Sequence, residues 1–297
     1  MSYTTEQIDW LRLYRTEGVG PITFYRLIQK YKTAAAAIDA LPHLVKTKSV
    51  TVAARTDAER ELEALTKLGG RMIFAGDEHY PLSLSAIEDA PPVLSVIGNL
   101  DLLKKQSVAI VGSRNASLNA RKLAAKMARD LGEADFVVSS GLARGIDTAV
   151  HEGALASGTV AVVAGGVDVV YPKENTELYK KICDQGAVIS ECALGTQPLA
   201  QHFPKRNRIV SGLSEGPVVV EANFRSGSLI TARMAGEQGR DVMAVPGFPS
   251  DPRSEGTNAL IRDGVTLVRS AEDILEVVRS FMTRPAYQST LFGTTEG

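Results

Sequence analysis

Up to about residue 70 the apolar positions recur every three or four residues, which is the spacing of amphipathic helices. The pattern predicts helices over 4–16, from Pro21 onward, over 33–41 and over 56–68. Pro21 suits the first position of a helix because an N–H there has no partner within the helix. Residues 1–70 are therefore predicted to form a small all-helical domain.

The turn between the first two of these helices reads Gly18-Val19-Gly20-Pro21. It resembles the turn of a helix-hairpin-helix, a module that holds a DNA backbone phosphate. A plain helical hairpin that packs on its neighbours is the commoner explanation of the same glycines, because G-x-G turns between helices are frequent. Both interpretations of this turn stay open.

Beyond residue 70 short apolar runs alternate with helical patterns. The runs predict strands at Arg71–Phe74, Val93–Ile97, Val108–Val111, Phe136–Ser139, Val160–Ala164, Ala187–Ser190, Pro217–Val220 and Val242–Val245. The helical patterns cover 118–133, 146–157, 174–184, 203–213 and 227–238. Strands that are apolar on both faces and alternate with helices predict an α/β fold, a Rossmann-like doubly wound and mainly parallel sheet over residues 71–283. The polar segment 284–297 is expected to be a flexible tail or linker.

Composition narrows the kind of protein without identifying it. The chain has 297 residues, of which 44% are hydrophobic and 23% charged, as in an ordinary globular protein. Its net charge of −1 provides no overall basic field, so a site for anions has to be local. Cys183 and Cys192 lack metal-ligand spacing, and we expect reduced thiols and no metal. With no secretory signal and no run of 18 apolar residues, the sequence predicts a cytoplasmic protein that does not contact a membrane.

Ligands of an open parallel sheet bind beyond the carboxyl ends of its strands, so the residues just after each strand are informative. Five successive loops there combine glycine or other small residues with Lys or Arg. The candidate phosphate-binding residues are Gly112, Ser113, Arg114, Gly141, Arg144, Lys173, Lys205, Arg206, Asn207, Arg208, Ser226, Gly227, Ser228 and Thr231. A single nucleotide needs one or two such loops, whereas five favour a longer polyanion such as a nucleic-acid strand. Tyr171, Phe203 and Phe224 are candidates for stacking on bases.

Enzymatic interpretations have less support. The loop after Val111 reads GSRNAS rather than G-x-G-x-x-G, and the sequence contains no Walker A lysine motif. His151, Glu191 and Glu221 lie near the expected edge of the sheet and are candidates for acid–base chemistry. His151 falls inside a predicted helix, where a core role is the better explanation. The sequence therefore predicts neither an enzyme nor a cofactor.

Several long motifs between residues 70 and 275 resemble the DNA-processing protein A family, also called DprA or Smf. They are VAIVGSRNAS, SGLARGIDTAVHEGAL, YPKEN, FPKRNRIVSGLSEGPVVVEA, RSGSLITA and GRDVMAVPG. The resemblance implies a single-stranded-DNA-binding protein that protects incoming DNA and loads the RecA recombinase during natural transformation. It further implies a homodimer that is not an enzyme. Many members also carry a winged-helix domain, which these residues do not include.

The resemblance assigns roles to individual residues. The family's DNA-contacting motifs fall on Arg114, Arg144, Lys173, the run Pro204 to Arg208 and the segment Ser226 to Thr231. The family's dimer surface falls on TNALIRDGVTLV, with Leu260, Ile261 and Val265 as its apolar candidates.

Two other functions remain as alternatives. One is a nucleotide-processing enzyme similar to the phosphoribohydrolases, which share the expected fold. Those enzymes carry a P-G-G-x-G-T-x-x-E motif, whereas Gly165-Gly166 is followed here by Val-Asp-Val-Val-Tyr-Pro. The other is a scaffold that binds a small anion to regulate a partner.

Overall fold

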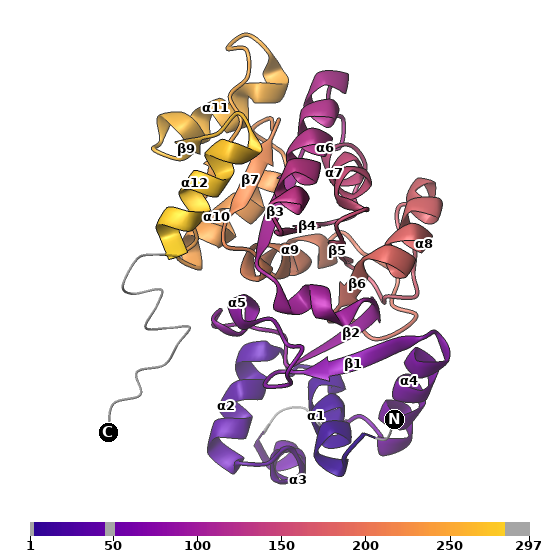
Figure 1. Ribbon diagram of the computed structural model, residues 1–297. Coiled ribbons are helices and arrows are strands. Elements are labelled where there is room, and N and C mark those ends of the chain that lie inside the picture. Colours follow the sequence, from indigo (N-terminus) through magenta and orange to yellow (C-terminus); the bar gives the residue numbers. More distant parts are fainter. Residues whose placement is uncertain (1–2, 45–50, 283–297) are drawn as a thin grey trace, which may run out of the picture.

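The computed structural model describes residues 3–44 and 51–282, and within them nine strands form one sheet (Figure 1). The strand order across the sheet is β1-β2-β6-β5-β4-β3-β7-β8-β9. The strands are β1 Gly70–Phe74, β2 Val93–Gly98, β3 Ser107–Gly112, β4 Val137–Ser140, β5 Thr159–Val162, β6 Ala187–Ser190, β7 Pro217–Val220, β8 Met243–Ala244 and β9 Thr266–Leu267.

The strands from β6 across to β9 are parallel, and β2 is antiparallel to both β1 and β6. Strand β3 is flanked by β4 on one side and β7 on the other, so the order along the chain reverses beside β3. This is the strand order of a doubly wound sheet, and the predicted fold class is confirmed.

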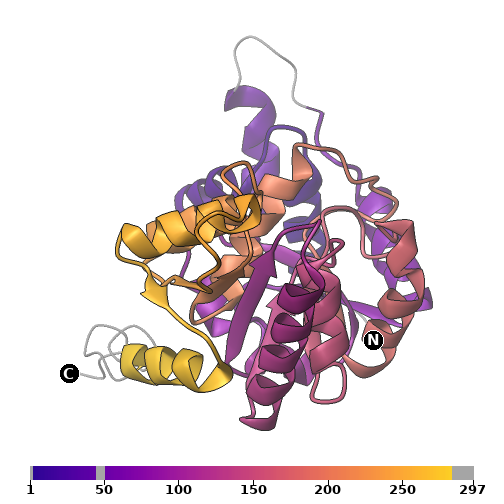
Figure 2. The ribbon, with the colours of Figure 1, turned by 90° about the horizontal axis from the view of Figure 1, so that it is seen from above.

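Helices cover both faces of the sheet (Figure 2). The alternation of side chains along β3 explains why: Val108 and Ile110 belong to one apolar cluster, Ala109 and Val111 to another. The first cluster includes residues of α6 Leu118–Glu133, α7 Ile146–Ala154 and α12 Ala271–Met282. The second includes residues of α5 Leu82–Ser85, α9 His202–Leu213 and α10 Ser228–Glu237. The two remaining α-helices that follow β1 in the described chain are α8 Thr176–Gln185 and α11 Glu255–Arg262.

Four helices precede the sheet, as the sequence predicts, and they lie beside β1 and β2 in Figure 1. They are α1 Thr5–Arg15, α2 Pro21–Tyr31, α3 Ala34–Leu44 and α4 Arg55–Lys67. Thr4 begins α1 with a capping box, in which its hydroxyl accepts from the Gln7 N–H at 3.2 Å and the Gln7 side chain accepts from the Thr4 N–H at 3.0 Å.

The four helices and the sheet share an apolar cluster. Leu11 and Leu62 from α1 and α4 pack with Met72, Phe74 and Val93 from β1 and β2. A second cluster around Phe24 lies within the helices themselves. The division of the chain at residue 70 stays a prediction, and the segment 284–297 lies outside the described residues.

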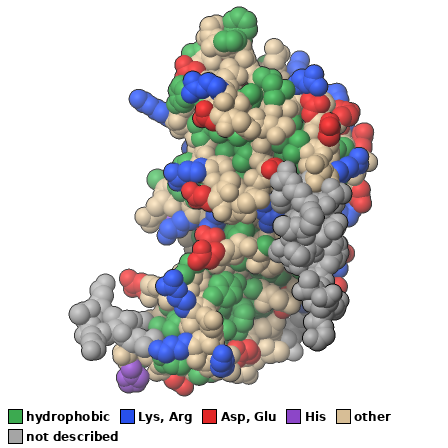
Figure 3. All heavy atoms as spheres, turned by 90° about the vertical axis from the view of Figure 1, so that its left-hand side faces the viewer, with side chains coloured by type: hydrophobic (Ala, Val, Ile, Leu, Met, Phe, Trp, Pro, Cys, Tyr) green, Lys and Arg blue, Asp and Glu red, His purple; other side chains and the backbone are tan. Residues whose placement is uncertain are grey.

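The surface carries charges of both signs. On the face shown in Figure 3, Lys and Arg side chains are interspersed with Asp and Glu. No helix in the described part of the chain combines the length and apolar character needed to span a bilayer.

Candidate functional site

A cavity of about 510 Å³ lies at the carboxyl ends of β3 and β7, where the strand order reverses. Its walls come from the loop after β3, from the loop between β7 and α10, and from the first turns of α9. Ligands of doubly wound proteins bind at such switch points because the connections leave β3 and β7 toward opposite faces of the sheet.

The two loops meet closely because residue 112 is a glycine. A Cβ on Gly112 would lie 2.0 Å from the carbonyl oxygen of Val220, closer than atoms can approach. The Ser113 N–H then donates to the Glu221 carbonyl oxygen at 2.8 Å. The glycine turn thus fixes Ser113 and Arg114 against the end of β7.

Arg206 supplies the positive charge nearest the base of the cavity. It is only 6% exposed, and within the described residues it forms no hydrogen bond or ion pair. Burial lowers its pKa to about 10, although the charge of Asp147 acts in the opposite direction. A buried cation without a partner is costly, so an anion that reaches Arg206 from the cavity is stabilised there.

Gly141 makes room for this guanidinium. A Cβ at this position would lie 1.7 Å from Arg206 Nη1. The N–H groups of Gly141 and Ala143 donate to the Asp147 carboxylate at 3.1 and 3.3 Å. Asp147 is therefore held by the loop after β4, and its own pKa is raised by burial.

Arg114 and Phe203 form the side of the cavity near α9, and Tyr171 packs against Phe203 outside the lining. The Arg114 guanidinium lies 5.2 Å from the centre of the Phe203 ring, a cation–π contact. The Phe203 ring centre lies 5.6 Å from that of Tyr171, which is 48% exposed. A basic and aromatic surface thus leads from the cavity to the outside.

Most of the predicted phosphate-binding residues meet at this cavity. Those that line it are Gly112, Ser113, Arg114, Arg206, Asn207, Ser226, Gly227, Ser228 and Thr231. Three predicted basic residues, Arg144, Lys173 and Lys205, are exposed outside the lining, and Arg144 forms an ion pair with Glu174.

Arg208 departs from the prediction. The sequence pattern groups it with the phosphate-binding residues, whereas its side chain is only 10% exposed and pairs with Glu191 and with Asp89, the latter at 3.3 Å. Burial by itself would lower the pKa of Arg208, but the two carboxylates outweigh burial and raise it. Residues two apart on a helix face different sides, so Arg206 and Arg208 cannot both face the cavity.

The cavity also contains residues outside the set of candidate phosphate-binding residues. Arg225 and Asn223 follow β7, and the Asn223 side chain accepts from the Arg225 N–H at 2.9 Å. Arg253 lies in the connection after β8. It forms an ion pair with Asp251 at 2.8 Å and a longer one with Glu221 at 3.9 Å. The sequence signal for Arg253 is its position after Val242–Val245, a predicted strand beyond the five whose loops carry the candidate residues.

His151 is a core residue, as expected. It is fully buried, its Nδ1 lies 2.8 Å from Thr159 Oγ1, and that hydroxyl donates to the Val138 carbonyl oxygen. Burial and, to a smaller extent, the charge of Arg206 lower its pKa to about 3. His151 is neutral at physiological pH and takes no part in the cavity surface.

A mainly parallel sheet with helices on both faces and a cavity lined by arginines at its switch point defines a doubly wound protein of the Rossmann-like class. The chain belongs to the DNA recombination-mediator protein A family, whose profile matches residues 71–279. The profile of the DprA-like N-terminal HHH domain matches residues 4–64. The family suggested by the sequence motifs is confirmed.

Individual relatives agree with this assignment. DNA processing protein DprA of Streptococcus pneumoniae is 50% identical over 201 residues, which are 67% of this chain and 71% of the relative. Protein Smf of Escherichia coli is 42% identical over 225 residues, which are 75% of this chain and 60% of that protein.

Two solved structures are similar as well. The X-ray structure of the Streptococcus pneumoniae protein has a TM-score of 0.77 at 36% identity, covering 93% of this chain and 98% of that one. A structure that concerns the single-stranded DNA binding mode of DNA processing protein A from Helicobacter pylori has a TM-score of 0.65 at 26% identity. It covers 71% of this chain and 96% of that one.

Proposed function

We propose that this chain binds single-stranded DNA through the cavity between β3 and β7, and that it thereby protects incoming DNA and loads RecA during natural transformation. The observation that carries the proposal is Arg206, a buried guanidinium without a partner at the base of that cavity. The similarity to a Helicobacter pylori protein whose structure concerns single-stranded DNA binding supports the same ligand.

The path of the strand follows from the positions of the basic residues. Arg114, Arg225 and Arg253 surround Arg206 at the cavity and are suited to adjacent backbone phosphates. Phe203 and the exposed Tyr171 offer faces on which bases stack. Exposed Lys173 and Lys205 extend the basic surface beyond the cavity. Because these groups contact phosphates and base faces, binding is expected to be largely independent of sequence and to weaken with salt.

Fluorescence anisotropy with a labelled oligo-dT, titrated at several salt concentrations, tests the proposed site. Arg114→Ala and Lys173→Ala should each weaken binding, Arg114→Ala more strongly because it also removes the contact with Phe203. Arg129→Ala is the matched control, since Arg129 is an exposed arginine of α6 outside the cavity. Unchanged affinity in both test variants would reject the site.

The proposal also covers the absence of catalysis and the location in the cytoplasm. Incubation with a panel of nucleotides separates the binding protein from a phosphoribohydrolase. Release of free base by the purified chain would support the enzyme instead.

Co-sedimentation with purified RecA on single-stranded DNA tests the recombinase partner.

A homodimer through α11 completes the proposal. Leu260, Ile261 and Val265 are only half-buried, and the neighbouring Leu267 on the edge strand β9 is exposed. Light scattering should give twice the chain mass, and Ile261→Glu should give the monomer mass. A monomer in the unmodified protein would refute this part.

A further inference from the structure

The helix that carries Arg206 is connected on its other side to the N-terminal helices. Arg208 of α9 forms an ion pair with the Glu191 carboxylate, which lies just after β6. The Tyr14 hydroxyl of α1 donates to the same Glu191 Oε2 at 2.7 Å. Two side chains that are far apart in the sequence, those of Tyr14 and Arg208, therefore share one carboxylate oxygen.

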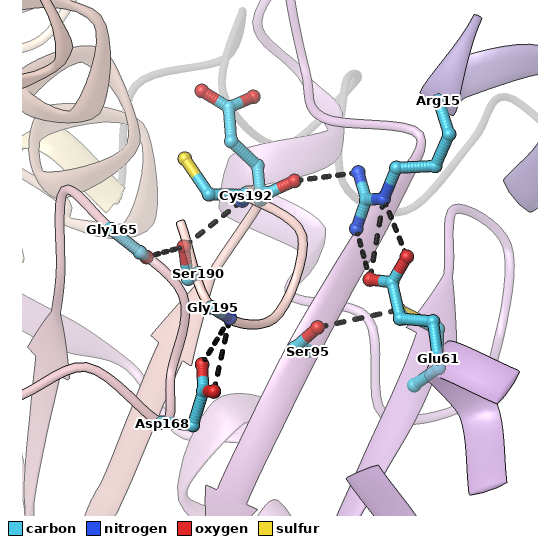
Figure 4. A network of polar contacts seen from close by, with 10 residues as sticks. Arg15, Glu61, Ser95, Gly165, Asp168, Ser190, Cys192 and Gly195 are labelled. Atoms are coloured by element: carbon cyan, nitrogen blue, oxygen red, sulfur yellow. Dashed lines mark hydrogen bonds and ion pairs between the residues drawn. The ribbon is translucent and has the colours of Figure 1, made fainter. Parts of the chain in front are cut away.

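A second contact from α1 holds the backbone of the same loop. Arg15 Nη1 donates to the carbonyl oxygen of Glu191 at 2.9 Å, and its other nitrogens bind Glu61 of α4 at 2.8 and 2.9 Å. Figure 4 shows the Arg15 guanidinium between the Glu61 carboxylate and the backbone beside Cys192. The loop after β6 is further fixed by the Ser190 hydroxyl, which donates to Gly165 and accepts from the Cys192 N–H.

This connection is buried, which makes its geometry well defined. Glu191, Arg15 and Arg208 have side chains exposed by 14%, 14% and 10%. Burial, followed by the charge of Glu191, raises the pKa of Tyr14 well above its usual value, so the phenol stays protonated and donates. Charged groups bound by such hydrogen bonds in a region of low dielectric have little freedom to reorient.

We propose that Tyr14 is a positioning residue for DNA binding, which orients α9 and hence Arg206 and Phe203 through Glu191 and Arg208. The proposal rests on the proposed function, because Arg206 and Phe203 are taken to contact the strand. It gives the N-terminal helices a part in recognition that does not require them to contact DNA. The geometric requirement is that Arg206 and Arg208 belong to one rigid turn of α9, so that fixing one side of the helix fixes the other.

The test is Tyr14→Phe in the full chain, which removes one hydroxyl and leaves the ring in place. The matched control is Tyr3→Phe. Tyr3 also belongs to the N-terminal region and also contacts the sheet, but its hydroxyl accepts from the Met72 N–H of β1 at 2.9 Å and has no connection to α9. We expect Tyr14→Phe to weaken oligo-dT binding about three- to tenfold, which corresponds to part of the free energy of one charge-assisted hydrogen bond. Tyr3→Phe should leave binding unchanged.

A double-mutant cycle separates positioning from a general loss of stability. If Tyr14 acts through α9, Tyr14→Phe should cause a smaller loss of affinity in an Arg206→Gln background than in the unmodified protein, because only the contribution of Phe203 remains to be displaced. It should cause its full loss in an Arg225→Ala background, since Arg225 belongs to the loop before α10. Equal losses in both backgrounds, or equal effects of Tyr14→Phe and Tyr3→Phe, would overturn the positioning role.

The same experiment distinguishes the two proposals. If Arg206→Gln and Arg225→Ala weaken binding while Tyr14→Phe does not, the positioning role is wrong and the proposed site stands. If Arg206→Gln and Arg225→Ala bind as tightly as the unmodified protein, the proposed site is wrong, and the positioning role is rejected with it.

Discussion

Arg206 and Arg208 lie two residues apart on α9 and have opposite surroundings. Arg206 has no ion-pair partner among the described residues, whereas Arg208 pairs with Glu191 and Asp89. Both are almost fully buried. The charge of Arg206 is therefore offset only in part, through space, by Asp147 and stays available to a ligand, whereas the charge of Arg208 is held in ion pairs of the fold.

This difference predicts different effects of the same substitution. Arg208→Gln leaves Glu191 without its cation and should lower the free energy of unfolding by about 3–5 kcal/mol. Arg206→Gln removes a charge that forms no ion pair and is attracted only through space to Asp147, so it should lower stability far less while weakening oligo-dT binding. Urea denaturation and anisotropy on both variants measure the two effects. A similar loss of stability in both would contradict the assignment.

Gly141→Ala should weaken DNA binding by displacing Arg206. The added methyl group would lie 1.7 Å from Nη1, so the guanidinium has to leave its position. We expect a loss of affinity of about tenfold, as for one charge-assisted contact. Gly236→Ala in α10 is the control: its Cβ meets nothing within 4 Å, and it should raise stability by about 0.5–1 kcal/mol without changing affinity. Equal affinities of the two variants would argue against the role of Gly141.

Phe203→Leu and Arg114→Ala should differ in their dependence on salt. Phe203→Leu removes a stacking surface and the cation–π contact, and we expect it to weaken binding roughly fivefold or more. Its plot of log Kd against log salt should keep the slope of the unmodified protein, because no phosphate contact is lost. Arg114→Ala should reduce that slope by about 0.7. A reduced slope for Phe203→Leu would indicate that the ring acts by holding Arg114 on a phosphate.

His151 predicts a loss of stability in acid. Its pKa is lowered from 6.5 to about 3, so between these values the unfolded chain binds a proton that the folded chain does not. The stabilisation is complete above pH 6.5 and is lost as the pH falls toward 3, with a slope of up to about 1.4 kcal/mol per pH unit. His151→Gln should flatten the dependence of unfolding free energy on pH between 4 and 6. An unchanged slope would show that other groups cause the loss.

Much of this architecture is predictable from periodicity. The predicted helix 118–133 coincides with α6, and Ala187–Ser190 and Pro217–Val220 coincide with β6 and β7. Apolar runs buried on both faces leave few alternatives to a parallel sheet with helices on each side. Strand β9 was not predicted because its two residues are exposed and form no apolar run.

The site was predictable as a location and less so as a set of side chains. Strand ends identify the edge of the sheet, which is why Arg114, Arg206 and Ser228 were found together. The direction of each side chain depends on the helix that carries it. A charge count cannot distinguish Arg206 from Arg208, since the carboxylates that hold Arg208 come from residues 89 and 191.

The apolar cluster shared by α1, α4, β1 and β2 has a thermodynamic consequence for the whole chain. Leu11 and Leu62 are buried against Met72 and Phe74, so melting the N-terminal helices would expose the outer part of the sheet to water. We expect a single calorimetric transition whose van't Hoff and calorimetric enthalpies agree, and two separated transitions would contradict this. Deleting residues 1–67 should then yield a chain that aggregates, because the apolar side chains of β1 and β2 would be exposed. The N-terminal helices are therefore expected to keep the sheet and its cavity in solution.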